Sequence, residues 1–163
     1  MDIKHIANGR VLFIGVGNPD RGDDGVGPFV INELLSAGFT NALDVGTVPE
    51  NFTGKIIQYQ PDTVIIIDAV SFGGTPGSWK LFSPEDCSDI GFSTHTASLQ
   101  LFASYLKQRI PVTVYLLGVQ PETIQFQTGL SPQVEKSLYM VVSVIKEIQS
   151  NNKQCSEFLK EYR

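Results

Sequence analysis

Three runs of mostly apolar, often β-branched residues constrain the fold of this chain more than any other feature. They span residues 10–16, 63–70 and 112–119, and the clearest reads TVIIIDAV. Continuous apolar runs of this length are typical of strands that are buried on both faces of a sheet. Because segments with apolar residues at helical spacing lie between them, we expect a mostly parallel sheet with helices on both faces.

The remaining pattern completes an α/β, three-layer sandwich with a twisted five-stranded sheet. Shorter strands are expected at residues 43–47 and 78–82. Helices are expected at 25–37, where Gly38 is a suitable C-cap, and at 51–59, 97–108 and 132–149. We expect one domain over residues 1–163 with its core at about 10–150, and a polar tail at 151–163 that is either helical or frayed.

Composition excludes several classes of protein. The 163 residues are 42% hydrophobic and 18% charged, as in a globular domain. A net charge of −5 argues against a general nucleic-acid binder, which needs a basic face. Cys87 and Cys155 lie far apart, which disfavours a zinc site or a disulfide scaffold. No apolar run reaches membrane-spanning length and the N-terminus has no signal-like segment, so we expect no membrane contact and a cytoplasmic location.

The carboxyl ends of the expected strands should form one rim, where ligands bind in such folds. Residues 17–24, 47–50 and 68–71 all reach this rim. Asp68 follows four apolar residues, and burying its carboxylate without a partner would be unfavourable or would raise its pKa. A helix N-terminus, a positive side chain or a metal ion could be that partner.

Two adjacent carboxylates, Asp23 and Asp24, stand between glycines just before the expected helix. One can hold the loop and cap the helix, which leaves the other to face the rim. Gly15 and Gly17 suggest a dinucleotide loop, but the G-x-G-x-x-G spacing fails and no Walker lysine follows. Because clustered carboxylates would repel a phosphate, a cation site is the stronger interpretation, and a solvated turn is the alternative.

The two histidines differ in their sequence context. His5 is in the polar N-terminal segment, where we expect a surface residue. His95 lies at the expected start of a helix, where the helix dipole favours the neutral imidazole that ligates metals. The alternative is that a neighbouring Ser or Thr caps the helix and His95 has no role. No G-x-S-x-G motif and no Cys–His setting supports nucleophilic catalysis.

Five motifs, in this order, resemble those of the maturation endopeptidases of nickel–iron hydrogenases, and within them the hydrogenase 3 branch. The resemblance covers residues 11–148 and implies a phosphorylase/hydrolase-like α/β fold. The motifs are GVGNPDRGDDGVGP (15–28), DVGTVPEN (44–51), IIIDAVSFGGTPGSWKLF (65–82), STHTASL (93–99) and LLGVQPETIQF (116–126). In that family two acidic residues and one histidine bind the metal, and by motif position the matches are Asp24, Asp68 and His95. Asp23 would then hold the loop and cap the helix.

The resemblance implies an aspartyl-type endopeptidase that removes the C-terminal extension of a hydrogenase large-subunit precursor after nickel insertion. The nickel is carried by the substrate, and zinc or cadmium could occupy the site in isolation. Three protein ligands leave coordination positions open. Either the metal or Asp24 or Asp68 as general base would activate the water, and the enzyme would act as a monomer on its large partner.

Gly46, Thr47 and Glu50 lie on the same expected rim and could shape the groove for the tail of the substrate. A tight turn in which Pro49 fixes φ is the alternative for Gly46. Two rival functions use the same residues. One is a nickel-sensing hydrogenase partner that does not cut, and the other is a nucleotide- or phosphate-binding hydrolase.

Overall fold

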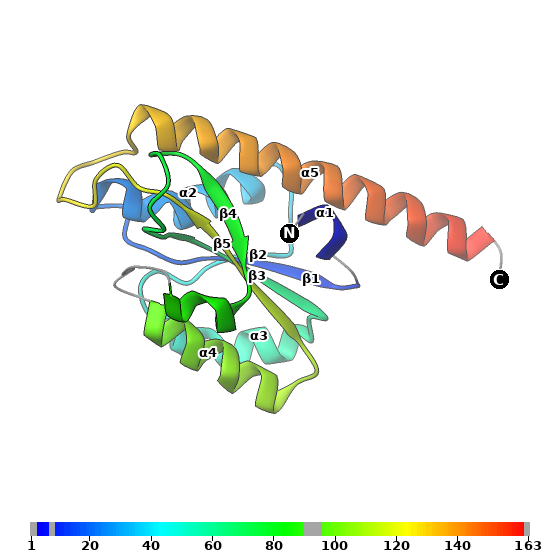
Figure 1. The fold of residues 1–163 in the computed structure, drawn as a ribbon. Coiled ribbons are helices and arrows are strands. Elements are labelled where there is room, and N and C mark those ends of the chain that lie inside the picture. The colour runs from blue at the N-terminus through cyan, green and yellow to red at the C-terminus, as the bar shows by residue number, and fades with distance from the viewer. Residues whose placement is uncertain (1–2, 7–8, 90–95, 162–163) are drawn as a thin grey trace.

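A five-stranded sheet forms the centre of the computed structural model, which describes residues 3–6, 9–89 and 96–161 (Figure 1). The strands are β1 (Val11–Gly15), β2 (Ala42–Asp44), β3 (Thr63–Ala69), β4 (Trp79–Phe82) and β5 (Thr113–Val119), in the order β2-β1-β3-β5-β4. All pairings are parallel except that of β4, which runs antiparallel along β5. The expected mostly parallel sheet is confirmed.

Helices cover both faces of the sheet, which confirms the expected three layers. They are α1 (Ile3–Ile6), α2 (Val26–Ser36), α3 (Thr53–Tyr59), α4 (Thr96–Arg109) and α5 (Pro132–Glu161). Three short 3-10 turns precede or join them: η1 (Gly22–Gly25), η2 (Pro49–Phe52) and η3 (Pro84–Asp89). Figure 1 shows α2 and α5 over one face and α3 and α4 over the other.

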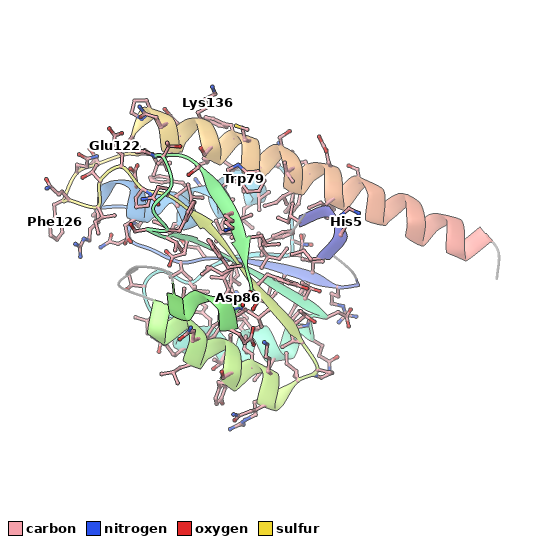
Figure 2. All side chains as sticks on the ribbon, viewed as in Figure 1. His5, Trp79, Asp86, Glu122, Phe126 and Lys136 are labelled. Carbon is pink, nitrogen blue, oxygen red and sulfur yellow. The ribbon has the colours of Figure 1, made fainter. Side chains whose placement is uncertain are left out.

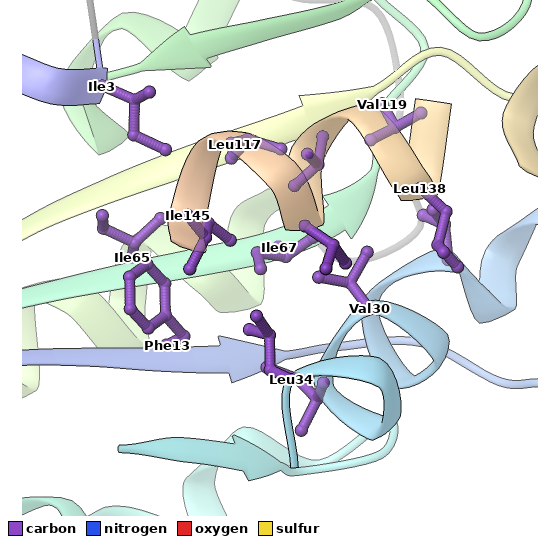
Figure 3. Close-up of a cluster of buried hydrophobic side chains, with 14 of the residues drawn as sticks. Ile3, Phe13, Val30, Leu34, Ile65, Ile67, Leu117, Val119, Leu138 and Ile145 are labelled. Carbon is purple, nitrogen blue, oxygen red and sulfur yellow. The ribbon is translucent and has the colours of Figure 1, made fainter. Parts of the chain in front are cut away.

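Alternating residues of the central strands supply the two halves of the core. Ile65 and Ile67 point to the α2 and α5 side, where Ile145 is also buried (Figure 3). Ile66 points to the opposite side and packs in the cluster of Phe102 from α4. This alternation is the ordinary pleat of a strand, so a strand that is apolar on both sides requires a helix layer on each.

The ends of several elements differ from the expectations. α2 ends at Ser36 with Ala37 as its C-cap, one residue earlier than expected, and Gly38 follows with a φ of +87° that allows the Phe39 N–H to bond the Leu34 carbonyl at 3.0 Å. β2 is shorter than expected, since it ends at Asp44 and leaves Thr47 in a turn. α5 continues to Glu161 and extends past the sheet, so the tail is helical over residues 151–161 (Figure 1). The N-terminal segment also contributes to the core, through buried Ile3.

The topology places a switch point between the carboxyl ends of β1 and β3. The chain leaves β1 toward α2 on one face and leaves β3 toward β4 and then α4 on the other. In open α/β sheets such a switch point is where ligands bind. Gly15 at the end of β1 pairs with Ile67, so Asp68 lies one residue beyond the end of β1. The η1 turn in the loop after β1 packs against β3, the strand that carries Asp68.

Among the described helices, none combines the length and the apolar character that a membrane crossing needs.

Candidate functional site

Asp68 is completely buried in β3, yet half of its carboxylate has no donor. Its Oδ1 accepts the N–H of Ala69 at 2.8 Å, while Oδ2 has no hydrogen-bond partner in the described part of the chain. Burial, and then the negative charge of Asp24, raise the pKa of Asp68 well above its usual range. A buried carboxyl group short of donors takes up a proton or needs a cation.

Asp24 supplies the second carboxylate, from the η1 turn after β1. It is 7% exposed, and its Oδ2 accepts the N–H of Asn18 at 2.9 Å. The η1 turn packs against β3, and the charge of Asp24 acts directly on Asp68. The structure therefore brings together two of the acidic residues that the sequence analysis selected for the metal site.

Two glycines explain how the loop reaches this position. A Cβ on Gly17 would lie 1.8 Å from the carbonyl oxygen of Asp24, and Gly17 has a φ of +136°. A Cβ on Gly27 would lie 2.3 Å from the carbonyl oxygen of Ile67 in β3. Because any side chain at either position would collide with backbone, these glycines let the loop and α2 approach the strands closely. Here they shape the loop that carries Asp24.

Asp23 has the opposite environment from its neighbour. It is also fully buried, but its Oδ2 accepts the N–H groups of Glu122 at 2.8 Å and Thr123 at 3.1 Å. Ser131 completes the set, since its N–H bonds Oδ1 at 2.7 Å and its hydroxyl bonds Oδ2 at 2.9 Å. Asp23 thus holds a loop, as expected, but it is the distant loop between β5 and α5.

The expected capping role of Asp23 is wrong. Among the described residues, neither η1 nor α2 has a side-chain hydrogen bond at its N-cap, and Gly25 occupies the N-cap of α2. The η1 turn continues directly into α2, with the N–H of Val26 bonded to the carbonyl of Asp23. The backbone of the turn does what a capping side chain does elsewhere, which frees the carboxylate for other donors.

The chain matches known proteins over most of its length. Residues 31–148 match the sequence profile of the HycI family, described as hydrogenase maturation protease. A putative hydrogenase maturation protease of Methanocaldococcus jannaschii is 31% identical over 85% of this chain and 88% of that protein. The chain belongs to the hydrogenase maturation proteases. The hydrogenase 3 maturation protease of Escherichia coli is 28% identical, over 86% of this chain and 91% of the relative.

A solved structure of a family member agrees with the fold of this protease. The crystal structure of a [NiFe] hydrogenase maturation protease HycI from Thermococcus kodakarensis superposes with a TM-score of 0.81 at 30% identity. The match covers 90% of this chain and 97% of that one. The comparisons confirm the family resemblance, its hydrogenase 3 branch and the assignment as a hydrolase of peptide bonds.

His95, the third expected metal ligand, lies outside the described residues, so its assignment stays a prediction. In the part of the chain that the structure describes, no three His, Cys, Asp or Glu side chains gather closely enough to hold a metal. The two carboxylates expected as ligands, Asp24 and Asp68, lie near each other, and α4 begins at Thr96, directly after His95. His5 lies in α1 and is exposed, as expected.

The three residues expected to shape the substrate groove occupy two different places. Gly46 forms a tight turn, with its N–H on Asp44 Oδ1 at 2.9 Å and its φ at +56°. Its carbonyl accepts the N–H of Gly17 at 2.9 Å, so this turn touches the loop of the carboxylates. Thr47 and Glu50 are exposed, and Glu50 lines a groove of about 630 Å³ between η2 and α4.

Sequence reasoning missed the residues that fix the loops around the rim. Besides Ser131, these include Gln120, which is 8% exposed and whose Oε1 accepts the N–H groups of Phe72 and Gly74. It also missed Arg21, whose guanidinium lies 5.3 Å from the ring centroid of Phe126. Two motifs marked these segments, GVGNPDRGDDGVGP for Arg21 and LLGVQPETIQF for Gln120, without indicating what the side chains contact. Ser131 lies outside all five motifs.

Proposed function

We propose that this protease removes the C-terminal extension of a nickel–iron hydrogenase large-subunit precursor after nickel insertion, and that Asp24, Asp68 and His95 contact the nickel of the substrate. The observation that carries the proposal is the unpartnered Oδ2 of buried Asp68 beside Asp24. Two crowded carboxylates gain much from a divalent cation, because it removes their repulsion and fills the missing donor position.

The atoms that would ligate the metal suit the nickel of the proposed substrate. Two carboxylate oxygens and one imidazole nitrogen bind divalent transition ions such as nickel or zinc, and three ligands leave positions for the substrate and water. The nickel would supply Lewis acidity and lower the pKa of a water that it binds. A precursor without nickel would leave the carboxylates facing each other, which explains why cleavage would wait for the metal.

Asp68 has the properties of a general base or acid for peptide hydrolysis. The raised pKa of its buried carboxyl group brings proton exchange closer to neutral pH than an exposed aspartate allows. Asp24, which keeps one hydrogen bond to Asn18, would orient the cation or the water. Activation of the water by the metal and by a carboxylate are both compatible with this arrangement.

Processing of nickel-loaded and nickel-free precursor by the purified protein tests the proposal. We expect cleavage only of the loaded precursor, and loss of cleavage in Asp24→Asn, Asp68→Asn and His95→Ala. Asp20→Asn is the matched control, because Asp20 is an exposed carboxylate in the same loop. Normal cleavage by all three site variants would refute the site, and equal cleavage of both precursors would refute the nickel requirement.

A further inference from the structure

The loop between β5 and α5, residues 121–131, is fixed to the loop that carries Asp24. We name it the rim loop. Its backbone pairs with residues 20–23 through three hydrogen bonds: Asp23 N–H to Thr123 carbonyl (3.0 Å), Gly22 N–H to Gln127 carbonyl (3.0 Å), and Gln127 N–H to Asp20 carbonyl (3.2 Å). The carboxylate of Asp23 adds the contacts described above. The rim loop therefore keeps a set position relative to Asp24.

This fixed loop presents apolar side chains to solvent. Phe126 is 81% exposed and Ile124 is 39% exposed. Figure 2 shows Phe126 at the outer end of the rim loop, pointing away from the body of the protein. Arg21 holds the ring, because its Nε donates to the Ile124 carbonyl at 3.3 Å while its guanidinium lies over Phe126. An aromatic ring that is already oriented loses little conformational entropy when a partner covers it.

We propose that Phe126, with Ile124 and Arg21 beside it, is a docking contact for the hydrogenase precursor. This inference rests on the proposed function, which has the scissile bond hydrolysed at Asp24 and Asp68. The rim loop follows β5 and η1 follows β1, so both stand at the same edge of the sheet. A folded protein that brings a peptide bond to this edge comes against the rim loop.

The chemistry of the contact defines the complementary surface of the precursor. Phe126 fits an apolar recess, and aromatic and arginine side chains are the types that dominate binding energy in protein interfaces. Within the described ranges Arg21 has no ion-pair partner, so its guanidinium can pair with a carboxylate or carbonyl group at the edge of that recess. A second copy of this chain is the competing occupant, and the experiment separates the two.

The test compares Phe126→Ala, Phe126→Leu and the wild type with Tyr139→Ala as matched control. Tyr139 is another exposed aromatic, 56% exposed on α5. Nickel-loaded precursor is titrated in the cleavage assay and in an equilibrium binding assay. We expect Phe126→Ala to raise KM and Kd about tenfold at unchanged kcat, and Phe126→Leu to lie between. Tyr139→Ala should stay within about twofold of the wild type, and thermal melting should be the same for all.

The other possible results contradict either the docking role of Phe126 or the proposed function. Wild-type affinity in Phe126→Ala, or a loss of kcat at unchanged KM, overturns the docking role. So does a wild type that binds no precursor, or a self-association that only Phe126→Ala disrupts in sedimentation. A wild type that binds loaded precursor without cutting it refutes the proposed function alone, and the affinities of the variants still decide the docking role.

Discussion

Asp23 and Asp24 are neighbours in the sequence and both are buried, yet their surroundings are opposite. Around Asp23, three backbone N–H groups and one hydroxyl converge on a single carboxylate. Around Asp24 and Asp68, two carboxylates share two hydrogen bonds among the described residues, and the buried Oδ2 of Asp68 has none. The number of donors therefore separates a carboxylate that holds the fold together from a pair that waits for a cation.

Removing the Asp23 carboxylate, which accepts all four hydrogen bonds, should have the largest effect on stability. We expect Asp23→Ala to lower the free energy of unfolding by about 3–5 kcal/mol, because four donors lose their partner inside the protein. Urea denaturation in chelator measures the loss. Asp23→Asn, which keeps one acceptor oxygen, should lose less. A loss below about 1 kcal/mol in Asp23→Ala would mean that water replaces the carboxylate easily.

A divalent cation should bind the Asp24 and Asp68 carboxylates and take the place of their missing hydrogen-bond donors. We expect Ni²⁺ at about 100 times its Kd to stabilise the wild type by roughly 3 kcal/mol, read as a rise of the melting temperature over the chelated protein. The rise should disappear in Asp24→Asn and in Asp68→Asn, while Asp20→Asn keeps it. An equal rise in all four proteins would place the ion elsewhere on this acidic chain.

Without metal, the lack of hydrogen-bond donors should make the Asp68 carboxylate destabilising at neutral pH. Burial and Asp24 raise its pKa, so the native state still holds a proton at pH values where the unfolded chain has released it. The stability of the wild type therefore falls as pH rises above about 4 toward the folded pKa. We expect Asp68→Asn to be more stable by about 1 kcal/mol at pH 7 in chelator, with the gain vanishing near pH 4. A gain that grows as pH falls would contradict this sign.

The exposed carboxylate of Glu85 is the reference for the buried ones, and its substitution should change stability least. Lys107 donates a hydrogen bond to Glu85, and this bond above all lowers the pKa of Glu85 to about 2. Its stabilisation is complete above the unfolded pKa near 4 and is lost as pH falls toward 2. Because Glu85 is 65% exposed, we expect Glu85→Gln to lose less than about 0.5 kcal/mol at pH 7. Titration of the unfolding free energy from pH 7 to pH 3 should show this loss shrinking with acid.

The sequence predicted the parts of the molecule that depend on neighbours along the chain. The apolar run before Asp68 indicated a central strand that ends in a buried carboxylate, and Gly38 indicated the end of α2. The parts that depend on distant partners were not predictable in this way. Nothing near Asp23 shows that its donors lie about 100 residues later, so a capping role was the natural but wrong expectation.

The direction of β4 and the exposure of Phe126 could not be predicted from the sequence either. The run at 78–82 predicted a strand, but only its pairing with β5 shows that β4 is antiparallel and lies at the edge of the sheet. Phe126 stands in a motif of the family, and a phenylalanine in a strand-ending segment would ordinarily be counted as core. Its exposure follows from how Arg21 and the rim loop meet, which local spacing does not record.

The hydrogen bonds that join Asp23 to the loop between β5 and α5 affect the order in which parts of this protein fold. The partners of Asp23 are separated from it by 99 to 108 positions, and they follow the fourth parallel strand. Closing so long a loop is slow and is favoured only after the contacts between have formed. A chain still emerging from the ribosome, with β5 not yet synthesised, therefore has Asp24 and Asp68 but does not yet hold them in a fixed arrangement. Proteolytic competence would arise as one of the last events of folding, when the enzyme is complete.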